Sequence, residues 1–191
     1  MTTPILHVSQ IAPILGLPTP AALGAAGLAW DCTRVLGGWV ELIETLAWEV
    51  LVQKTPSRGR SLRNLTVNVF HPFELLTAAW STGSFDWDPE LDTAREEQLR
   101  SAHTIVRYAR ERHVGWLDFV LGHEAQLDDA DRLITSPRGE ITFANLLTQQ
   151  RWHAAFHYRQ LVAFLGGEGH DVGATVDLAA IGGLELPADI F

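Results

Sequence analysis

Apolar positions between residues 31 and 53 recur with the spacing of an α-helix. Arg34, Glu41, Thr45 and Glu49 form one polar stripe at steps of seven, four and four residues, and apolar side chains cover the remaining circumference. This apolar arc is wider than a helix on the outside of a lone bundle requires. Two interpretations stay open: a deeply packed core helix, or a helix that also forms a homodimer interface.

Turn and capping signals divide the rest of the chain into three further helices. Ser61 is a favourable N-cap after the turn KTPSRG, Asp88 precedes a proline at a helix start, and Thr142 precedes the last helical stretch, which stops at Gly166 and Gly167. The expected helices span residues 31–53, 61–80, 89–122 and 142–165. With their short or moderate connections they predict an all-α fold, an antiparallel four-helix bundle in a single domain spanning residues 1–191.

The two ends of the chain lack this helical period. Residues 1–30 are punctuated by prolines and show no secretory signal, so an irregular N-terminal segment is expected. The apolar run within them is too short and too broken by proline to span a membrane. Residues 168–191 mix glycine with small and apolar side chains, and predict an extended tail packed on the bundle and anchored by Leu184, Leu186, Pro187, Ile190 and Phe191.

The charge balance narrows the range of partners. There are 14 basic and 23 acidic residues, a formal net charge of −9, and no basic stripe interleaved with aromatic side chains, which argues against a nucleic-acid partner. The single cysteine, Cys32, excludes an internal disulfide and is compatible with a reducing compartment, so a cytoplasmic location is expected. Cys32 has no adjacent histidine or CxxC partner, and is interpreted as a small buried hydrophobe.

Two histidines four residues apart, His153 and His157, are the first sign of chemistry. Four residues turn a helix about 40° past one full turn, so both imidazoles lie on one face and can share a metal ion. His71 lies in the second helix before Pro72, which predicts a kink or a break there. His71, His153 and His157 together would form a three-imidazole metal site that leaves coordination positions open.

The remaining histidines and cations fit this site poorly. His103, His113 and His123 follow one another at steps of ten residues, about 280° each on a helix, so they point in different directions and are assigned to the surface or to packing. Arg151 and Arg159 lie more than about 100° from His153 and are not expected to bind substrate. No general base is determined by the sequence, and Glu74 is a speculative candidate.

Amide side chains flank the proposed metal face on both helices. Gln149 and Gln160 fall within about 40° of His153, and Asn64 and Asn68 within about 60° of His71. We expect them to hold the second imidazole nitrogen of a ligand, or to contact the substrate.

The segments GRSLRNLTVNVFH, ending at His71, and HAAFHYRQL, beginning at His153, resemble those of the DinB-like bundle proteins. These proteins have a histidine in the second helix after a segment similar to GRSLRNL, and later a pair similar to HxxxHRGQL. The resemblance covers roughly residues 31–166. Tyr158 and Arg159 stand where the common motif has Arg-Gly, which leaves the triad intact and puts a role for the arginine in doubt.

This resemblance implies a function. It maps His71, His153 and His157 onto a metal triad, and it implies a thiol-dependent S-transferase or isomerase. In such an enzyme a divalent ion, Zn, Ni or Fe, acts as Lewis acid, with a small-molecule substrate and a low-molecular-weight thiol as cosubstrate. Two alternatives stay open: a non-catalytic, stress-associated metal-binding homodimer, and a small-ligand binding protein without turnover.

Overall fold

The computed structural model describes residues 24–56, 59–127, 132–173, 176–181 and 183–190, and this part of the chain is mostly helical. The only strands among these residues form a two-stranded sheet. The helices are α2 (Ala25–Ile43), α3 (Trp48–Leu51), α4 (Leu62–Thr82), α5 (Pro89–Gln98), α6 (Ala102–Leu127) and α7 (Phe143–Gly167). The strands are β1 (Leu133–Ser136) and β2 (Gly139–Thr142), and a short 3-10 turn, η1, spans Leu178–Ala180.

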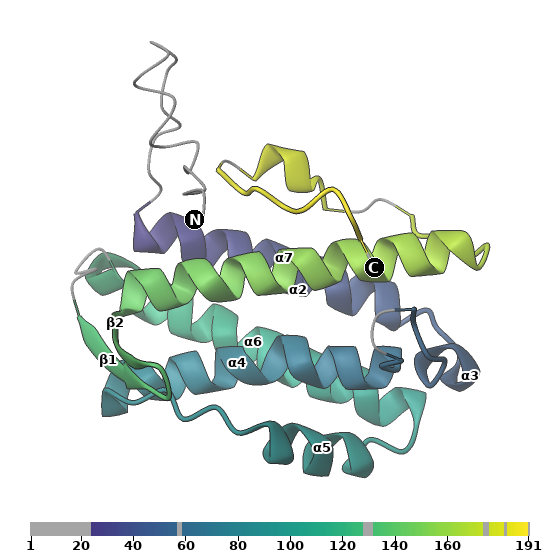
Figure 1. Cartoon of the computed structure of the whole chain (residues 1–191), viewed down its shortest axis with the longest axis horizontal. Helices are drawn as coiled ribbons and strands as arrows, with labels where there is room; N and C mark the ends of the chain where they lie inside the picture. The colour runs from purple at the N-terminus through teal and green to yellow at the C-terminus, as the bar shows by residue number, and fades with distance from the viewer. Residues whose placement is uncertain (1–23, 57–58, 128–131, 174–175, 182, 191) are drawn as a thin grey trace, which may run out of the picture.

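The four long helices α2, α4, α6 and α7 lie side by side along the length of the molecule (Figure 1). α2 packs against α6 and α7, and α4 packs against α5, α6 and α7. Large aromatic side chains fill the space between them: Trp39 meets the edge of Phe70, and Phe73 meets Trp116 with ring centroids 5.1 Å apart. Burial of such rings supplies much of the hydrophobic stabilisation of the core.

The second and fourth predicted helices begin at their predicted caps. Ser61 Oγ accepts a hydrogen bond from the backbone N–H of Asn64 at the start of α4, and Thr142 Oγ1 accepts one from Asn145 at the start of α7. The sequence predicted a kink or a break at His71, and a break is absent: α4 continues through Pro72 as one helix. Proline removes one backbone hydrogen bond, and the surrounding side chains are buried in the core, so tertiary packing keeps the helix continuous.

The first predicted helix, 31–53, is wrong at both ends. α2 begins at Ala25, six residues earlier, because Ala25 and Ala29 are buried and Ala29 O accepts a hydrogen bond from Trp116 of α6. It ends at Ile43, where Thr45 Oγ1 donates to Leu42 O, and α3 follows separately. The sequence predicted an irregular segment over residues 1–30. This prediction is wrong for residues 25–30, which are helical, and residues 1–23 lie outside the described part of the chain.

The third predicted helix, 89–122, is two helices. α5 ends at Gln98 and α6 begins at Ala102. Ser101 precedes α6: its Oγ accepts a hydrogen bond from Thr104 N, and Thr104 Oγ1 accepts one from Ser101 N. This reciprocal cap satisfies donors that a continuous helix would bond internally. α6 then runs to Leu127, five residues past the predicted end.

The break between α5 and α6 lets α5 fold back against α4. Glu96 of α5 accepts hydrogen bonds from Ser61, Arg63 and Asn64 of α4 or its cap. The hairpin β1–β2 fixes the preceding loop, since Phe85 N donates to Thr135 O and Thr135 N donates to Gly83 O. The bonds of Glu96 hold the end of α5 beside the start of α4, and the hairpin holds the loop that leads into α5.

The tail after α7 contains the short 3-10 turn η1 and otherwise lacks helix or strand where it is described. Ile181 is buried in the core, and Leu184 and Leu186 are partly buried against it, as two of the predicted anchors require. Pro187 and Ile190 contribute backbone carbonyls to contacts with α7, and Phe191 lies outside the described residues. Among the described residues, no helix combines the length and the apolar character needed to cross a membrane.

Candidate metal centre

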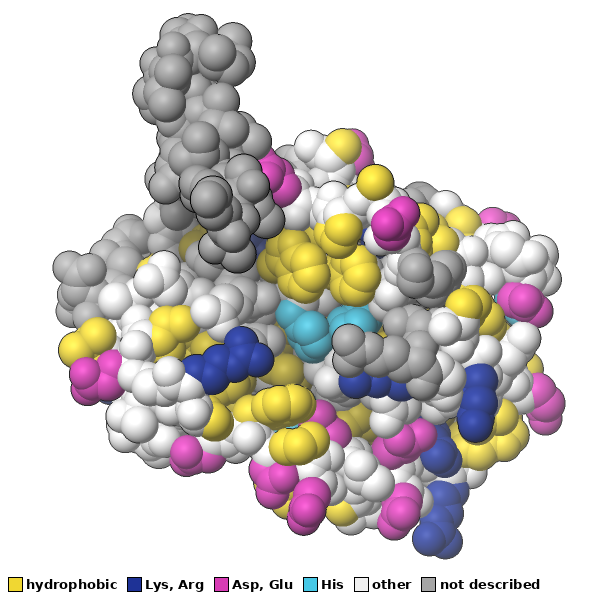
Figure 2. Space-filling view, viewed as in Figure 1, with side chains coloured by type: hydrophobic (Ala, Val, Ile, Leu, Met, Phe, Trp, Pro, Cys, Tyr) yellow, Lys and Arg dark blue, Asp and Glu magenta, His cyan; other side chains and the backbone are white. Residues whose placement is uncertain are grey.

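α7 places His153 and His157 one turn apart, as the four-residue spacing predicts. Their ring centroids are 4.7 Å apart and the rings are perpendicular. His157 is buried and His153 is half-buried. Figure 2 shows histidine side chains reaching the surface near the middle of one face of the molecule, next to apolar side chains.

His71, on the facing helix α4, is almost completely buried, with 1% of its surface exposed. Its Nδ1 lies 2.5 Å from Oδ1 of Asp92 on α5, and Trp87 Nε1 donates to the other carboxylate oxygen at 3.3 Å. Its Nε2 is buried and has no hydrogen-bond partner among the described residues. A carboxylate on Nδ1 favours the tautomer whose lone pair is at Nε2.

His153 links α7 to α4 through Asn68, which lies three residues before His71. Its Nε2 is 3.2 Å from Asn68 Oδ1, which also accepts from Arg60 at 3.3 Å. A guanidinium can only donate, so this contact fixes the amide with its oxygen toward both partners. His153 therefore donates from Nε2, and its lone pair is at Nδ1, which is buried without a partner among the described residues.

His157 is oriented in the same manner by Gln160. Nδ1 of His157 lies 2.7 Å from Oε1 of Gln160, whose Nε2 donates to the carbonyl of Ile190 at 2.6 Å. The carbonyl can only accept, so the amide orientation is again determined. Oε1 of Gln160 therefore faces His157 as an acceptor for a proton on Nδ1.

Burial keeps His153 neutral. Loss of solvation, followed by the nearby His157 and Arg60, lowers its pKa to about 3, while Asp92 acts in the opposite direction. A neutral imidazole is the form that binds metal.

The donor chemistry therefore fits a divalent ion: each imidazole has one nitrogen held by an oxygen acceptor, and the second nitrogen of His71 and of His153 keeps its lone pair. The arrangement is not yet that of a bound ion. Within residues 24–56, 59–127, 132–173, 176–181 and 183–190, no three His, Cys, Asp or Glu side chains are grouped as a metal would require.

The four amides expected around the histidines divide into two pairs. Asn68 and Gln160 each hold the second nitrogen of an imidazole, the role that their helical positions predict. Asn64 instead donates to Glu96 of α5 at 2.5 Å. Gln149 is exposed on α7 and makes no side-chain hydrogen bond with the described residues.

The residues set aside by the helical wheel lie elsewhere. Arg151 is buried and forms an ion pair with Asp31 at 2.7 Å, and Arg159 donates to backbone carbonyls of the tail. Glu74, the speculative general base, forms ion pairs with Arg95 at 2.8 Å and with Arg112 at 3.1 Å. Its carboxylate is therefore engaged by two guanidinium groups.

The other sequence candidates are packed as expected. Cys32 is fully buried, and burial raises the pKa of its thiol, as a small buried hydrophobe requires. His123 stacks on Phe119 with centroids 4.7 Å apart, His113 is half-buried with its pKa lowered chiefly by burial, and His103 is exposed.

Sequence reasoning missed Asp92 and Trp87. Asp92 lies one turn after the N-cap Asp88, where an acidic side chain is ordinarily explained by the helix dipole. Its contact with His71 depends on α5 turning back onto α4, and a continuous helix over 89–122 would not allow this.

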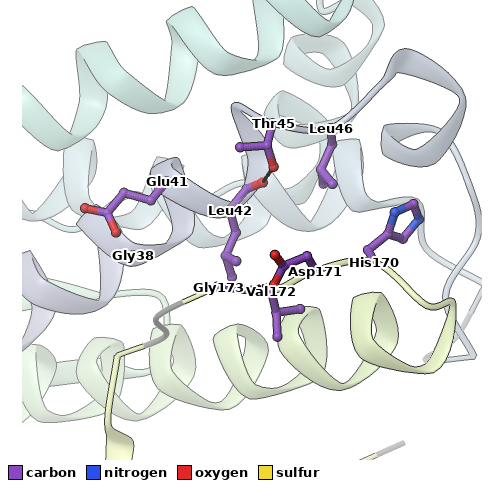
Figure 3. Close-up of a pocket in the computed structure, with 9 residues that line it drawn as sticks. All are labelled: Gly38, Glu41, Leu42, Thr45, Leu46, His170, Asp171, Val172 and Gly173. Carbon is purple, nitrogen blue, oxygen red and sulfur yellow. Dashed lines mark hydrogen bonds between the residues drawn. The ribbon is translucent and has the colours of Figure 1, made fainter.

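A cavity lies away from these histidines. It has a volume of about 550 Å³ and lies between the C-terminal half of α2 and residues 170–173. Glu41 and His170 lie at opposite ends of it, with Leu42 and Val172 between them (Figure 3). Its polar groups do not converge on one point, so it lacks the geometry of a catalytic site.

Comparisons of the chain with protein-family models, with curated proteins and with solved structures find no match.

Proposed function

We propose that this protein is a divalent-metal-dependent enzyme of the DinB-like type, a thiol-dependent transferase or isomerase. In this proposal α2, α4, α6 and α7 form an antiparallel four-helix bundle, and His71, His153 and His157 hold the ion. One observation carries the proposal: each of these three imidazoles is held through one ring nitrogen by an oxygen acceptor, as metal-binding histidines usually are.

The chain's own residues act by orienting donors. Asp92 holds the ring of His71 so that Nε2 is the donor, and Gln160 does the same for Nε2 of His157. Asn68 holds Nε2 of His153, which leaves Nδ1 as the donor atom. His153 is the least buried of the three, so we infer that its side chain moves most when the set assembles.

A bound divalent ion would supply Lewis acidity, lowering the pKa of a thiol or polarising a substrate carbonyl. Three neutral imidazoles suit Zn, Ni or ferrous iron. A low-molecular-weight thiol as cosubstrate and one reduced, buried cysteine both agree with a cytoplasmic location.

The test is metal content together with thiol conjugation. The protein is purified without a chelating tag, and its metal is measured by mass spectrometry before and after reconstitution. Wild type should hold about one ion per chain, and His71→Ala, His153→Ala and His157→Ala should lose it. His103→Ala, an exposed histidine on α6, is the control and should retain it. A wild-type protein that takes up no stoichiometric metal after reconstitution would contradict the site.

A second candidate is a non-catalytic metal-binding homodimer. Val114 and Leu121 are exposed by 52% and 59% and lie seven residues apart on one side of α6, which favours an apolar contact surface. The apolar arc of α2 does not carry this candidate, since it is buried within the chain against α6 and α7. Bound metal without thiol-dependent activity, with a dimer by light scattering, would favour this second function.

A further inference from the structure

Two aromatic side chains lie along α7 beside the proposed ligands. Trp152 and Phe156 are one turn apart and stack, with ring centroids 5.1 Å apart and planes inclined by 7°. Phe156 also meets the ring of His157 at 5.5 Å, and Trp152 directly precedes His153. Figure 2 shows apolar side chains next to the histidines at the surface of the molecule. We call Trp152 and Phe156 the aromatic pair.

The aromatic pair is held in one orientation by the chain itself. Trp152 Nε1 donates a hydrogen bond to the backbone carbonyl of Glu185 at 2.9 Å, and the guanidinium of Arg159 lies over the ring of Phe156. Trp152 is nevertheless 40% exposed, so part of its ring is open to a ligand. Because the rings are already ordered, contact with a further ring costs them little conformational entropy.

Arg60 brings a positive charge to the same place. Its Nη1 lies 3.3 Å from Asn68 Oδ1, and Nε2 of His153 lies 3.2 Å from the same oxygen, so the guanidinium and the imidazole meet at one atom. Arg60 is half-buried, and Figure 2 shows basic side chains close to the histidines. A guanidinium presents five N–H donors in a fork that fits a carboxylate.

Other arginines next to aromatic rings are already engaged. Arg159 donates to two backbone carbonyls of the tail, and Arg63, which lies over Trp48, forms an ion pair with Glu96 at 3.0 Å. The guanidinium of Arg60 donates one hydrogen bond, to an amide, and is in no ion pair with the carboxylates of the described residues. It can therefore attract an anion locally, although the chain has a formal net charge of −9.

We propose that the surface formed by Arg60, Trp152 and Phe156 binds a small aromatic carboxylate. The aromatic pair contacts the ring, and the guanidinium of Arg60 binds the carboxylate beside the histidines. A neutral aromatic molecule gains only the first contact, and an aliphatic acid only the second. Binding of the acid does not depend on metal; only its assignment as the substrate class of the metal site rests on the proposed function.

The test is the binding of three matched probes to the metal-free, full-length protein, measured by ligand-observed NMR. Benzoate has both features, benzyl alcohol lacks the charge, and cyclohexanecarboxylate lacks the aromatic ring. Wild type should bind benzoate about 3–10-fold more tightly than either of the other two. Equal affinities for benzoate and benzyl alcohol would overturn the proposal, and this comparison does not depend on the folding of any variant.

Two variants assign the two contacts. Arg60→Gln keeps a donor toward Asn68 and loses the charge, so it should bind benzoate and benzyl alcohol alike. Trp152→Leu keeps an apolar side chain and loses the ring, so its preference for benzoate over cyclohexanecarboxylate should disappear. An undiminished preference in either variant would show that the residue does not make the proposed contact.

Trp48→Leu and Arg107→Gln are the matched controls. Trp48 is a half-buried tryptophan under another arginine, and Arg107 is an exposed arginine on α6. Both variants should retain the wild-type affinities for all three probes. Losses in the controls as large as those in Trp152→Leu and Arg60→Gln would assign the binding to unspecific contacts and overturn the proposal.

Metal uptake separates this inference from the proposed function. Discrimination among the probes by a protein that takes up no metal supports the surface and contradicts the metal site. Metal uptake without discrimination does the reverse. In a protein that takes up Co²⁺, bound benzoate should show paramagnetic broadening of its proton signals, and the absence of broadening from bound benzoate would overturn its assignment as the substrate class.

Discussion

Asp92 holds His71 across 21 residues of sequence, with Oδ1 2.5 Å from Nδ1 and both side chains buried. The contact joins α5 to α4 at the most deeply buried of the three proposed ligands. Trp87 Nε1 donates to the other oxygen of Asp92, so the carboxylate is held on both sides. A carboxylate in this position fixes the tautomer of the imidazole and raises its basicity as a ligand.

Asp92→Ala should therefore weaken metal binding without removing a ligand. We expect the dissociation constant for Zn²⁺ to rise about 10–100-fold, and the unfolding free energy to fall by about 1–3 kcal/mol as Nδ1 of buried His71 loses its partner. Calorimetric titration and thermal unfolding measure the two effects. Glu97→Ala removes an exposed carboxylate from the same helix and is the matched control. Equal zinc affinities for the two variants would contradict a role for Asp92.

Acid should destabilise the protein through His153. Its folded pKa of about 3 lies below the unfolded value near 6.5, so the unfolded state binds more protons between these values. The stability contribution is complete above about pH 6.5 and is lost progressively as the pH falls toward 3. Between about pH 7 and pH 4.5 we expect a loss of about 2–3 kcal/mol from this residue.

The check is chemical denaturation across that pH range in wild type and in His153→Gln. Glutamine keeps a donor toward Asn68 and does not titrate, so its profile should be flatter than that of wild type. His103→Gln removes an exposed histidine and should leave the wild-type slope. Parallel profiles for wild type and His153→Gln would show that His153 is not the group responsible.

The helices that the sequence predicted well are those whose ends carry local signals. Ser61 and Thr142 are side-chain caps, and both begin the helices expected of them. The failures occur where tertiary contacts decide. The α5–α6 break was marked by Ser101 and Thr104, but the periodicity across it resembled one helix and concealed the cap.

The candidate site shows the same division. His153 and His157 share a face because helical geometry requires it, and Asn68 and Gln160 are placed by the same wheel. Asp92 was not predictable, because its position depends on how α5 packs against α4. Asn64 also lies on the predicted face of α4, but its side-chain amide donates to Glu96 of α5 instead of contacting a histidine.

Gly38 and Gly115 should respond oppositely to replacement by alanine. A Cβ at Gly38 in α2 would lie 2.5 Å from Val176 Cγ2 and 3.0 Å from Tyr158 Oη, whereas a Cβ at Gly115 in α6 meets nothing within 4 Å. Gly38→Ala should destabilise the protein by about 1–3 kcal/mol through overpacking. Gly115→Ala should stabilise it by about 0.5–1 kcal/mol, since alanine favours a helix interior. Thermal unfolding of both variants measures these changes. A Gly38→Ala variant as stable as wild type would show that the tail around Val176 moves to make room for the new methyl group.

The buried pair Arg151–Asp31 should matter far more than an exposed one. Its atoms approach to 2.7 Å with side-chain exposures of 5% and 3%, whereas Arg107 and Glu111 on α6 lie 3.8 Å apart and are about 60% exposed. Arg151→Met leaves the carboxylate of Asp31 buried, with Arg34 as its remaining cation, so we expect a loss of about 3 kcal/mol. Arg107→Met should cost less than about 0.5 kcal/mol.

Removal of both buried charges tests the physical reason for this loss. Asp31→Leu combined with Arg151→Met leaves no buried carboxylate, so chemical denaturation should show recovery of most of the stability lost by Arg151→Met alone. Packing of the Arg151 stem provides the competing explanation, because methionine keeps most but not all of its apolar length. A double variant as unstable as Arg151→Met would assign the loss to packing rather than to the uncompensated charge of Asp31.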